Sequence, residues 1–138
     1  MSSIISKSLW SLCLLMMVSV FSSCGDHHDH SDEGNTVIID LISPVPDKKV
    51  DEPSNIIISV NFSATVSQHK LEVTLTPVDK PEEKIISWVN NTHEKYFEYR
   101  KTINLSSYAD GTSFLLKLKS CSDHDCINFL EREFKFTI

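Results

Sequence analysis

The sequence predicts an all-β fold, an antiparallel sandwich of two sheets with about seven strands. Three observations favour this fold class. Apolar and polar residues alternate in short blocks, turn-forming residues separate these blocks, and no stretch keeps a period of 3.6 residues over three helical turns. The alternating part runs from residue 36 to residue 138, which is the size of one domain.

Seven segments carry the alternation. They are residues 36–43, 55–64, 70–77, 85–89, 96–105, the alternating part of 107–120, and 129–138. The second is the clearest, because Ile56, Ile58 and Phe62 lie on one face of the expected strand and Ser59 and Asn61 on the other. Two prolines follow the first segment and remove backbone donors, so we expect that strand to end there.

Two of the segments predict a local irregularity or a turn. Lys101 falls on the same face as Phe97 and Tyr99, so we expect a bulge or a change of sheet near Lys101. The dipeptide Asp110-Gly111 predicts a tight turn before the sixth strand.

The first 23 residues have the layout of a secretory signal peptide. Lys7 precedes an apolar run from Leu9 to Phe21, which is shorter than the roughly 20 residues of a membrane-spanning helix. The stretch VFSSC resembles the lipobox of bacterial lipoproteins and implies that Cys24 becomes the lipidated first residue of the mature chain. Phe21 stands where that pattern prefers Leu. The alternative is an ordinary secretory signal peptide, with Cys24 unmodified.

The segment from Cys24 to Asn35 is expected to be a disordered tail, because it has no apolar residue after the cysteine. It resembles the acidic stretch behind the lipidated cysteine of surface-exported lipoproteins in Bacteroidota-type bacteria, which implies the outer membrane. The tail also offers imidazole and carboxylate groups that bind zinc, nickel or copper. The candidate ligands are Asp26, His27, His28, Asp29 and His30. The alternative is a solvated export signal.

Composition excludes some classes of function. The formal net charge is −6 and basic residues form no patch, which argues against nucleic-acid binding. The chain has three glycines and lacks a nucleophile elbow, a phosphate-binding loop and a zinc-protease motif, so we expect no enzyme activity and no cofactor.

Cys121 and Cys126 are the two cysteines of the expected folded part. In an oxidising compartment they predict one disulfide, since positions flanking a hairpin turn lie about 4.5 to 5.5 Å apart at their Cα atoms. The competing interpretation is a structural metal bound by both thiolates and His124, with Asp123 or Asp125 as a fourth ligand.

The pattern LEVTL, YRKTINL, YADGTSFLLKLKSCSDHDC and FKFTI resembles the single immunoglobulin-like domains of small Bacteroidota-type lipoproteins, a family without an assigned function. This resemblance covers residues 36–138 and implies an immunoglobulin-like sandwich. Such domains serve as adhesive, ligand-binding or spacer modules, so the fold alone does not decide the function.

An aromatic-rich stretch offers one candidate binding surface. Trp88, Tyr96 and Tyr99 are candidates for an exposed platform that binds a glycan or a peptide. The alternative is that they are core or cross-strand residues.

The sequence thus predicts a lipid-anchored protein of the outer membrane, on its periplasmic or its external face, with a non-catalytic binding or adhesion module. The partner would be a glycan, a peptide or an envelope protein. The alternatives are a metal-handling lipoprotein that uses the tail, and a structural subunit of an envelope assembly.

Overall fold

The structure is a computed structural model and describes residues 34–138. Several expectations lie outside the described residues: the signal peptide, lipidation of Cys24, the tail as far as residue 33, and the candidate ligands Asp26, His27, His28, Asp29 and His30. Asn35, the last residue assigned to the tail, is described, and its side-chain amide donates to the carbonyl of Ser67 at 2.6 Å. Among the residues from 34 onward, no helix is long and apolar enough to cross a membrane.

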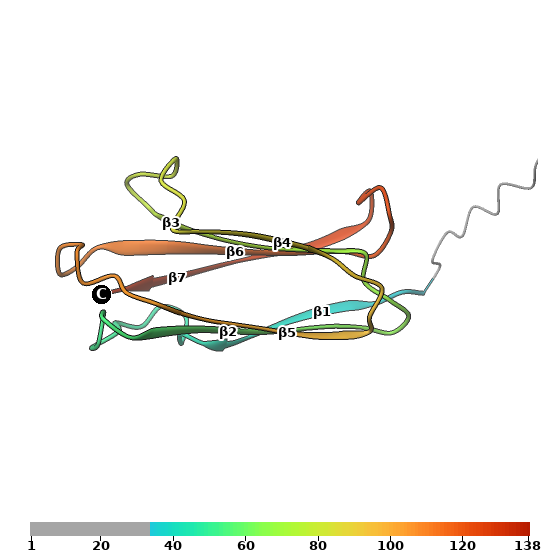
Figure 1. Cartoon of the computed structure of the whole chain (residues 1–138), viewed down its shortest axis with the longest axis horizontal. Helices are drawn as coiled ribbons and strands as arrows, with labels where there is room; N and C mark the ends of the chain where they lie inside the picture. Colours follow the sequence, from blue (N-terminus) through green and yellow to red (C-terminus); the bar gives the residue numbers. More distant parts are fainter. Residues whose placement is uncertain (1–33) are drawn as a thin grey trace, which may run out of the picture. The chain divides into compact units, whose positions relative to one another are not determined.

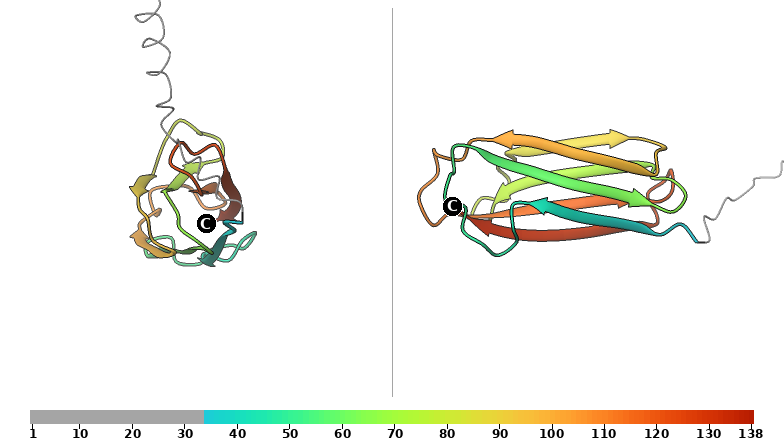
Figure 2. Two further views of the ribbon diagram at one scale, coloured as in Figure 1. Left: turned by 90° about the vertical axis from the view of Figure 1, so that its right-hand side faces the viewer. Right: turned by 90° about the horizontal axis from the view of Figure 1, so that it is seen from below.

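The described residues form seven strands in two sheets that face one another (Figures 1 and 2). The strands are β1 (Val37–Ser43), β2 (Ile56–Ala64), β3 (Lys70–Pro77), β4 (Ile86–Asn91), β5 (Tyr96–Ile103), β6 (Ser113–Cys121) and β7 (Phe129–Thr137). One sheet has the order β1-β2-β5 and the other β4-β3-β6-β7, and every pair of neighbouring strands is antiparallel. The predicted antiparallel sandwich of two sheets and about seven strands is therefore confirmed.

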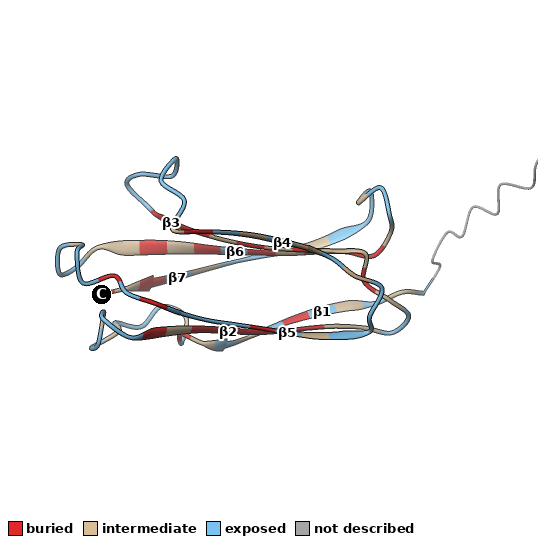
Figure 3. Ribbon diagram, viewed as in Figure 1, coloured by how far each residue is buried: buried red, intermediate tan, exposed pale blue. Residues whose placement is uncertain are grey.

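The core fills the space between the two sheets, as the alternation predicts. In β2 the side chains of Ile58, Val60 and Phe62 are fully buried, and in β6 those of Leu116 and Leu118 are too. Figure 3 shows the buried positions along the strands of both sheets and the exposed ones mostly in the connecting loops. Burial of these alternating apolar residues is the main term that holds the sheets together.

The strand β5 has no bulge at Lys101, so that expectation is wrong. Its pairing with β2 runs without a register shift from Tyr96 to Ile103. Because β5 is an edge strand, the side chain of Lys101 reaches water without leaving the sheet, and it is exposed. The register shift in this sheet lies instead in β1, between Leu41 and Ser43.

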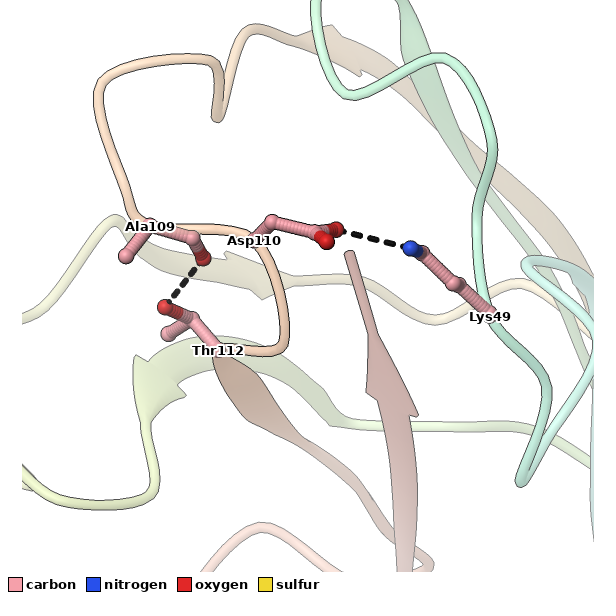
Figure 4. A network of polar contacts seen from close by, with 4 residues as sticks. All are labelled: Lys49, Ala109, Asp110 and Thr112. Carbon is pink, nitrogen blue, oxygen red and sulfur yellow. Dashed lines mark hydrogen bonds and ion pairs between the residues drawn. The ribbon is translucent and has the colours of Figure 1, made fainter.

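The turn predicted at Asp110 and Gly111 lies at the end of the sandwich where the chain ends (Figure 1). Gly111 has a φ of 86°, which a residue with a side chain rarely adopts. Asp110 accepts a hydrogen bond from Lys49 Nζ at 2.7 Å, and Thr112 Oγ1 donates to the carbonyl of Ala109 at 2.6 Å (Figure 4). The hydrogen bond from Lys49 lowers the pKa of Asp110. Both groups are largely exposed, so this ion pair adds little stability.

Candidate metal centre at one end of the sandwich

Three histidines meet at the end of the sandwich opposite the Asp110-Gly111 turn. His69 directly precedes β3, His93 lies between β4 and β5, and His124 lies between β6 and β7. In an antiparallel sandwich these alternate connections lie at the same end, and Figure 1 shows the three loops there. One ring nitrogen from each histidine lies within 4.8 Å of the other two.

Backbone hydrogen bonds fix the position of His69 between the two other loops. Its N–H donates to the carbonyl of Cys121 at 2.9 Å, where β6 ends. Its carbonyl accepts from the N–H of Thr92 at 3.1 Å, just after β4. This residue is thus joined on one side to the loop of His124 and on the other to the loop of His93.

A buried glutamine next to His69 joins the same loops through hydrogen bonds. Gln68 is fully buried, and its side-chain oxygen accepts a hydrogen bond from Ser120 Oγ at 2.9 Å. Its side-chain nitrogen donates to the carbonyl of Lys95 at 3.3 Å, and its backbone N–H donates to the carbonyl of Glu94 at 3.1 Å. Gln68 therefore links the turn that carries His93 to the end of β6.

The disulfide predicted between Cys121 and Cys126 is present, and His124 lies inside its loop. The two Cα atoms are 4.9 Å apart, within the range expected for hairpin flanks. Because both sulfurs are bonded to each other, they are not metal ligands in this state. The alternative of a metal site with two thiolate ligands in this hairpin therefore does not apply to the oxidised chain. The ring of His124 is not part of the disulfide and can still offer a nitrogen to a metal.

Asp123 stabilises the hairpin through two backbone hydrogen bonds. Its carboxylate accepts the backbone N–H of Ile127 at 2.8 Å and that of Asn128 at 2.6 Å. Burial would raise the pKa of Asp123, but the N–H donors of Asn128 and Ile127 outweigh it and lower the pKa. The carboxylate of Asp123 is thus occupied by the hairpin backbone. To act as a metal ligand, as the sequence suggested, it would have to give up these hydrogen bonds.

The three imidazole rings are in contact with one another. The ring centroids of His69 and His124 are 4.0 Å apart, those of His69 and His93 5.0 Å, and those of His93 and His124 5.2 Å. His69 is half-buried with its Nε2 at 3.5 Å from Ser67 Oγ, whereas His93 and His124 are exposed. One ring is thus held in place, and the two exposed rings have room to rotate.

This arrangement has the donor chemistry of a transition-metal site. Imidazole nitrogen binds zinc, copper and nickel, and three nitrogens around a tetrahedral zinc ion lie about 3.3 Å from one another. Rotation of the exposed rings of His93 and His124 would close the remaining gap. Glu94, Asp123 and Asp125 add negative charge beside the histidines, which favours a cation.

Sequence reasoning missed most of this cluster. It considered His124 with the two cysteines and gave no role to His69 or His93. The chain has six histidines, and those outside the tail are the three that meet here. The available signal was their position in alternate connections, between the second and third, fourth and fifth, and sixth and seventh expected strands.

The expected aromatic platform does not form as one surface. Tyr99 is 5% exposed, and Trp88 packs against it with ring centroids 4.8 Å apart, between the sheets. Tyr96 is 53% exposed and lies on the other face of β5, because successive residues of a strand point to opposite faces. Its hydroxyl donates to Asn61 Oδ1 at 3.1 Å. The alternation therefore divides these aromatics between core and surface.

Comparisons with known proteins give no assignment. No family model and no curated protein matches the chain. Among solved structures, it is similar to wild-type OgpA from Akkermansia muciniphila, with 13% sequence identity and a TM-score of 0.45. That match covers 72% of this chain and 28% of the OgpA chain.

Proposed function

We propose that this chain is a non-catalytic envelope module that binds one transition-metal ion through His69, His93 and His124. The observation that carries this proposal is the convergence of three ring nitrogens within 4.8 Å of one another, from three separate loops. The metal site differs from the one expected in the tail. It rests on loops that hydrogen bonds and a disulfide hold in place.

The chemistry of the site favours zinc, copper or nickel. Three neutral imidazoles suit these ions better than calcium or magnesium, which prefer oxygen ligands. Three protein ligands leave one position of a tetrahedral ion open to water or to another donor. Ligands on a fixed scaffold lose little conformational entropy when a metal binds, whereas a flexible tail would lose much more.

We also propose that the module is lipid-anchored through Cys24 in the outer membrane. The support is the sequence pattern of residues 1–23 and the lipobox-like VFSSC. Several acyl chains on one cysteine give stable anchoring, since each buried methylene contributes about 0.8 kcal/mol. In a bacterial host, labelled palmitate should be incorporated into the full chain and not into a Cys24→Ser variant. Equal labelling of both would contradict the anchor.

The metal proposal is tested by calorimetric titration with Zn²⁺, Ni²⁺ and Cu²⁺. A chain that starts at Gly25 suits this test, because residues 34–138 contain all seven strands and the core. We expect one ion per chain. His93→Ala should weaken binding at least about tenfold, because it removes one of three ligands from an exposed position that contributes little to the fold.

A matched control is provided by the other three histidines of the chain. Replacing His27, His28 and His30 together by Ala removes the same number of imidazoles from the tail. We expect this variant to keep the single site. Loss of binding in the tail variant, with binding retained in His93→Ala, would assign the metal to the tail and refute the loop site. Absence of binding in the unaltered chain would refute both.

A further inference from the structure

The four edge strands of the described sandwich differ in how they are protected against pairing. The strand β1 carries Asp40 and ends before a proline, while β5 and β7 each carry several charged residues. The charged positions are Glu98, Arg100 and Lys101 in β5, and Glu131, Arg132, Glu133 and Lys135 in β7. Charges of this kind are a common protection of exposed edges. The strand β4, with the sequence ISWVNN, has none.

The unprotected edge is rigid, because its inward side chains are anchored in the core. Ile86 is 1% exposed. Trp88 packs on Tyr99 and Phe97 of the opposite sheet, with ring centroids 4.8 and 5.5 Å apart. A strand held in this way is already in the conformation that an added strand requires, so pairing needs little ordering of the edge itself.

The backbone groups available for pairing follow from the register with β3. Thr92 donates its N–H to the carbonyl of His69, and hydrogen-bonding residues alternate along an antiparallel pair. Trp88 and Asn90 therefore face β3, whereas Ser87, Val89 and Asn91 direct N–H and C=O away from the sheet. Val89 is the middle residue of these three, and its side chain is 55% exposed.

We propose that β4 pairs antiparallel with β4 of a second copy of this chain, centred on Val89. The occupant is a second copy because a neutral strand opposite itself brings no like charges together. Ser87 would lie opposite Asn91 and Val89 opposite Val89, which joins two four-stranded sheets into one and covers an exposed apolar side chain. This pairing is self-complementary and closes at the dimer.

Sedimentation of the chain that starts at Gly25, with a chelator present to exclude metal-bridged association, tests the pairing. We expect a dimer for the unaltered chain. Val89→Lys places two ammonium groups opposite each other and should raise the dimer dissociation constant at least about tenfold. Ile38→Lys is the matched control, because Ile38 is 50% exposed on β1, an edge strand of the other sheet, so this variant should stay dimeric.

Amide hydrogen exchange locates the contact. Exchange at Ser87, Val89 and Asn91 should slow as protein concentration rises, while Trp88 and Asn90 should be protected at every concentration. A monomer up to several hundred micromolar would overturn the proposal, as would a dimer that Ile38→Lys dissociates and Val89→Lys does not. A monomer that captures an extended peptide along β4 would also overturn it, in favour of a peptide-binding edge. Trp88 fluorescence verifies that both variants are folded.

Discussion

Replacing Gln68 by Leu should destabilise the domain, although it exchanges a buried polar side chain for an apolar one. The change leaves the buried hydroxyl of Ser120 without its acceptor, and a buried unsatisfied polar group costs about 1 to 3 kcal/mol. The second side-chain bond, to the carbonyl of Lys95, is longer, at 3.3 Å, and that residue is exposed, so water can replace it. We therefore expect a loss of about 2 kcal/mol, or about 8 to 10 °C in Tm for a domain of this size.

The assay is urea unfolding of the chain that starts at Gly25, with the disulfide intact. The fluorescence of Trp88 reports unfolding without a second tryptophan signal, because the chain's other tryptophan, Trp10, precedes Gly25 and is absent from the shortened chain. Gln68→Leu should lower the midpoint without changing the slope with denaturant, since the surface exposed on unfolding stays the same.

A double variant separates this hydrogen bond from a packing effect. Adding Ser120→Ala to Gln68→Leu removes the stranded hydroxyl, so the double variant should be more stable than Gln68→Leu alone by about 1 kcal/mol. A purely additive result, or a Gln68→Leu variant within about 0.5 kcal/mol of the unaltered chain, would show that the buried pair does not link the loops as argued.

Three further predictions concern the disulfide, a buried phenol and the hairpin carboxylate. Replacing Cys121 and Cys126 by Ala should cost about 2 kcal/mol in urea unfolding and weaken zinc binding in calorimetry, because the loop that holds His124 is no longer closed. Equal zinc affinity would refute a positioning role for the bridge. The buried hydroxyl of Tyr99 has no hydrogen-bond partner among the described residues, so Tyr99→Phe should raise unfolding stability by about 1 to 2 kcal/mol, and a loss would contradict that view. The lowered pKa of Asp123 contributes stability that is present above the unfolded-state pKa of about 3.9 and lost as pH falls through the folded-state value. Unfolding curves of Asp123→Asn and the unaltered chain should therefore differ at pH 7 and converge in strong acid.

Period-two alternation predicted the strands well because burial between two sheets imposes it directly. One face of β2 is buried between the sheets, and this face requires apolar residues at every second position. The same requirement makes Ile58 and Phe62 point inward and makes the alternation visible in the sequence. Lys101 shows the limit of the rule. Its position on the inward face of β5 implied a bulge, but an edge strand lets a long side chain reach water past the sheet, and which strands form edges is not written in a local pattern.

The aromatic side chains show a second limit. Trp88 and Tyr99 lie on different strands from different sheets, and both point into the space between them. Sequence proximity suggested a common surface, whereas the alternation already placed Tyr96 and Tyr99 on opposite faces of one strand. The period-two rule, applied to this pair, was a better guide than aromatic composition.

The histidine site depends on which loops carry the three histidines and on the order of the strands in the sheet. The sequence indicates the first of these and not the second. Strand count places the three histidine-bearing loops at one end, because connections in an antiparallel sandwich alternate between its ends. Their contact depends on strand order. β3 lies between β4 and β6, so His69, at the start of β3, lies between the turn that leaves β4 and the turn that leaves β6. Those turns carry His93 and His124. With β3 at an edge, the same three histidines would share an end of the sandwich without meeting, and no metal could bind all of them. The candidate site is therefore a property of the sheet order, which is set by long-range pairing and not by any residue in the loops themselves.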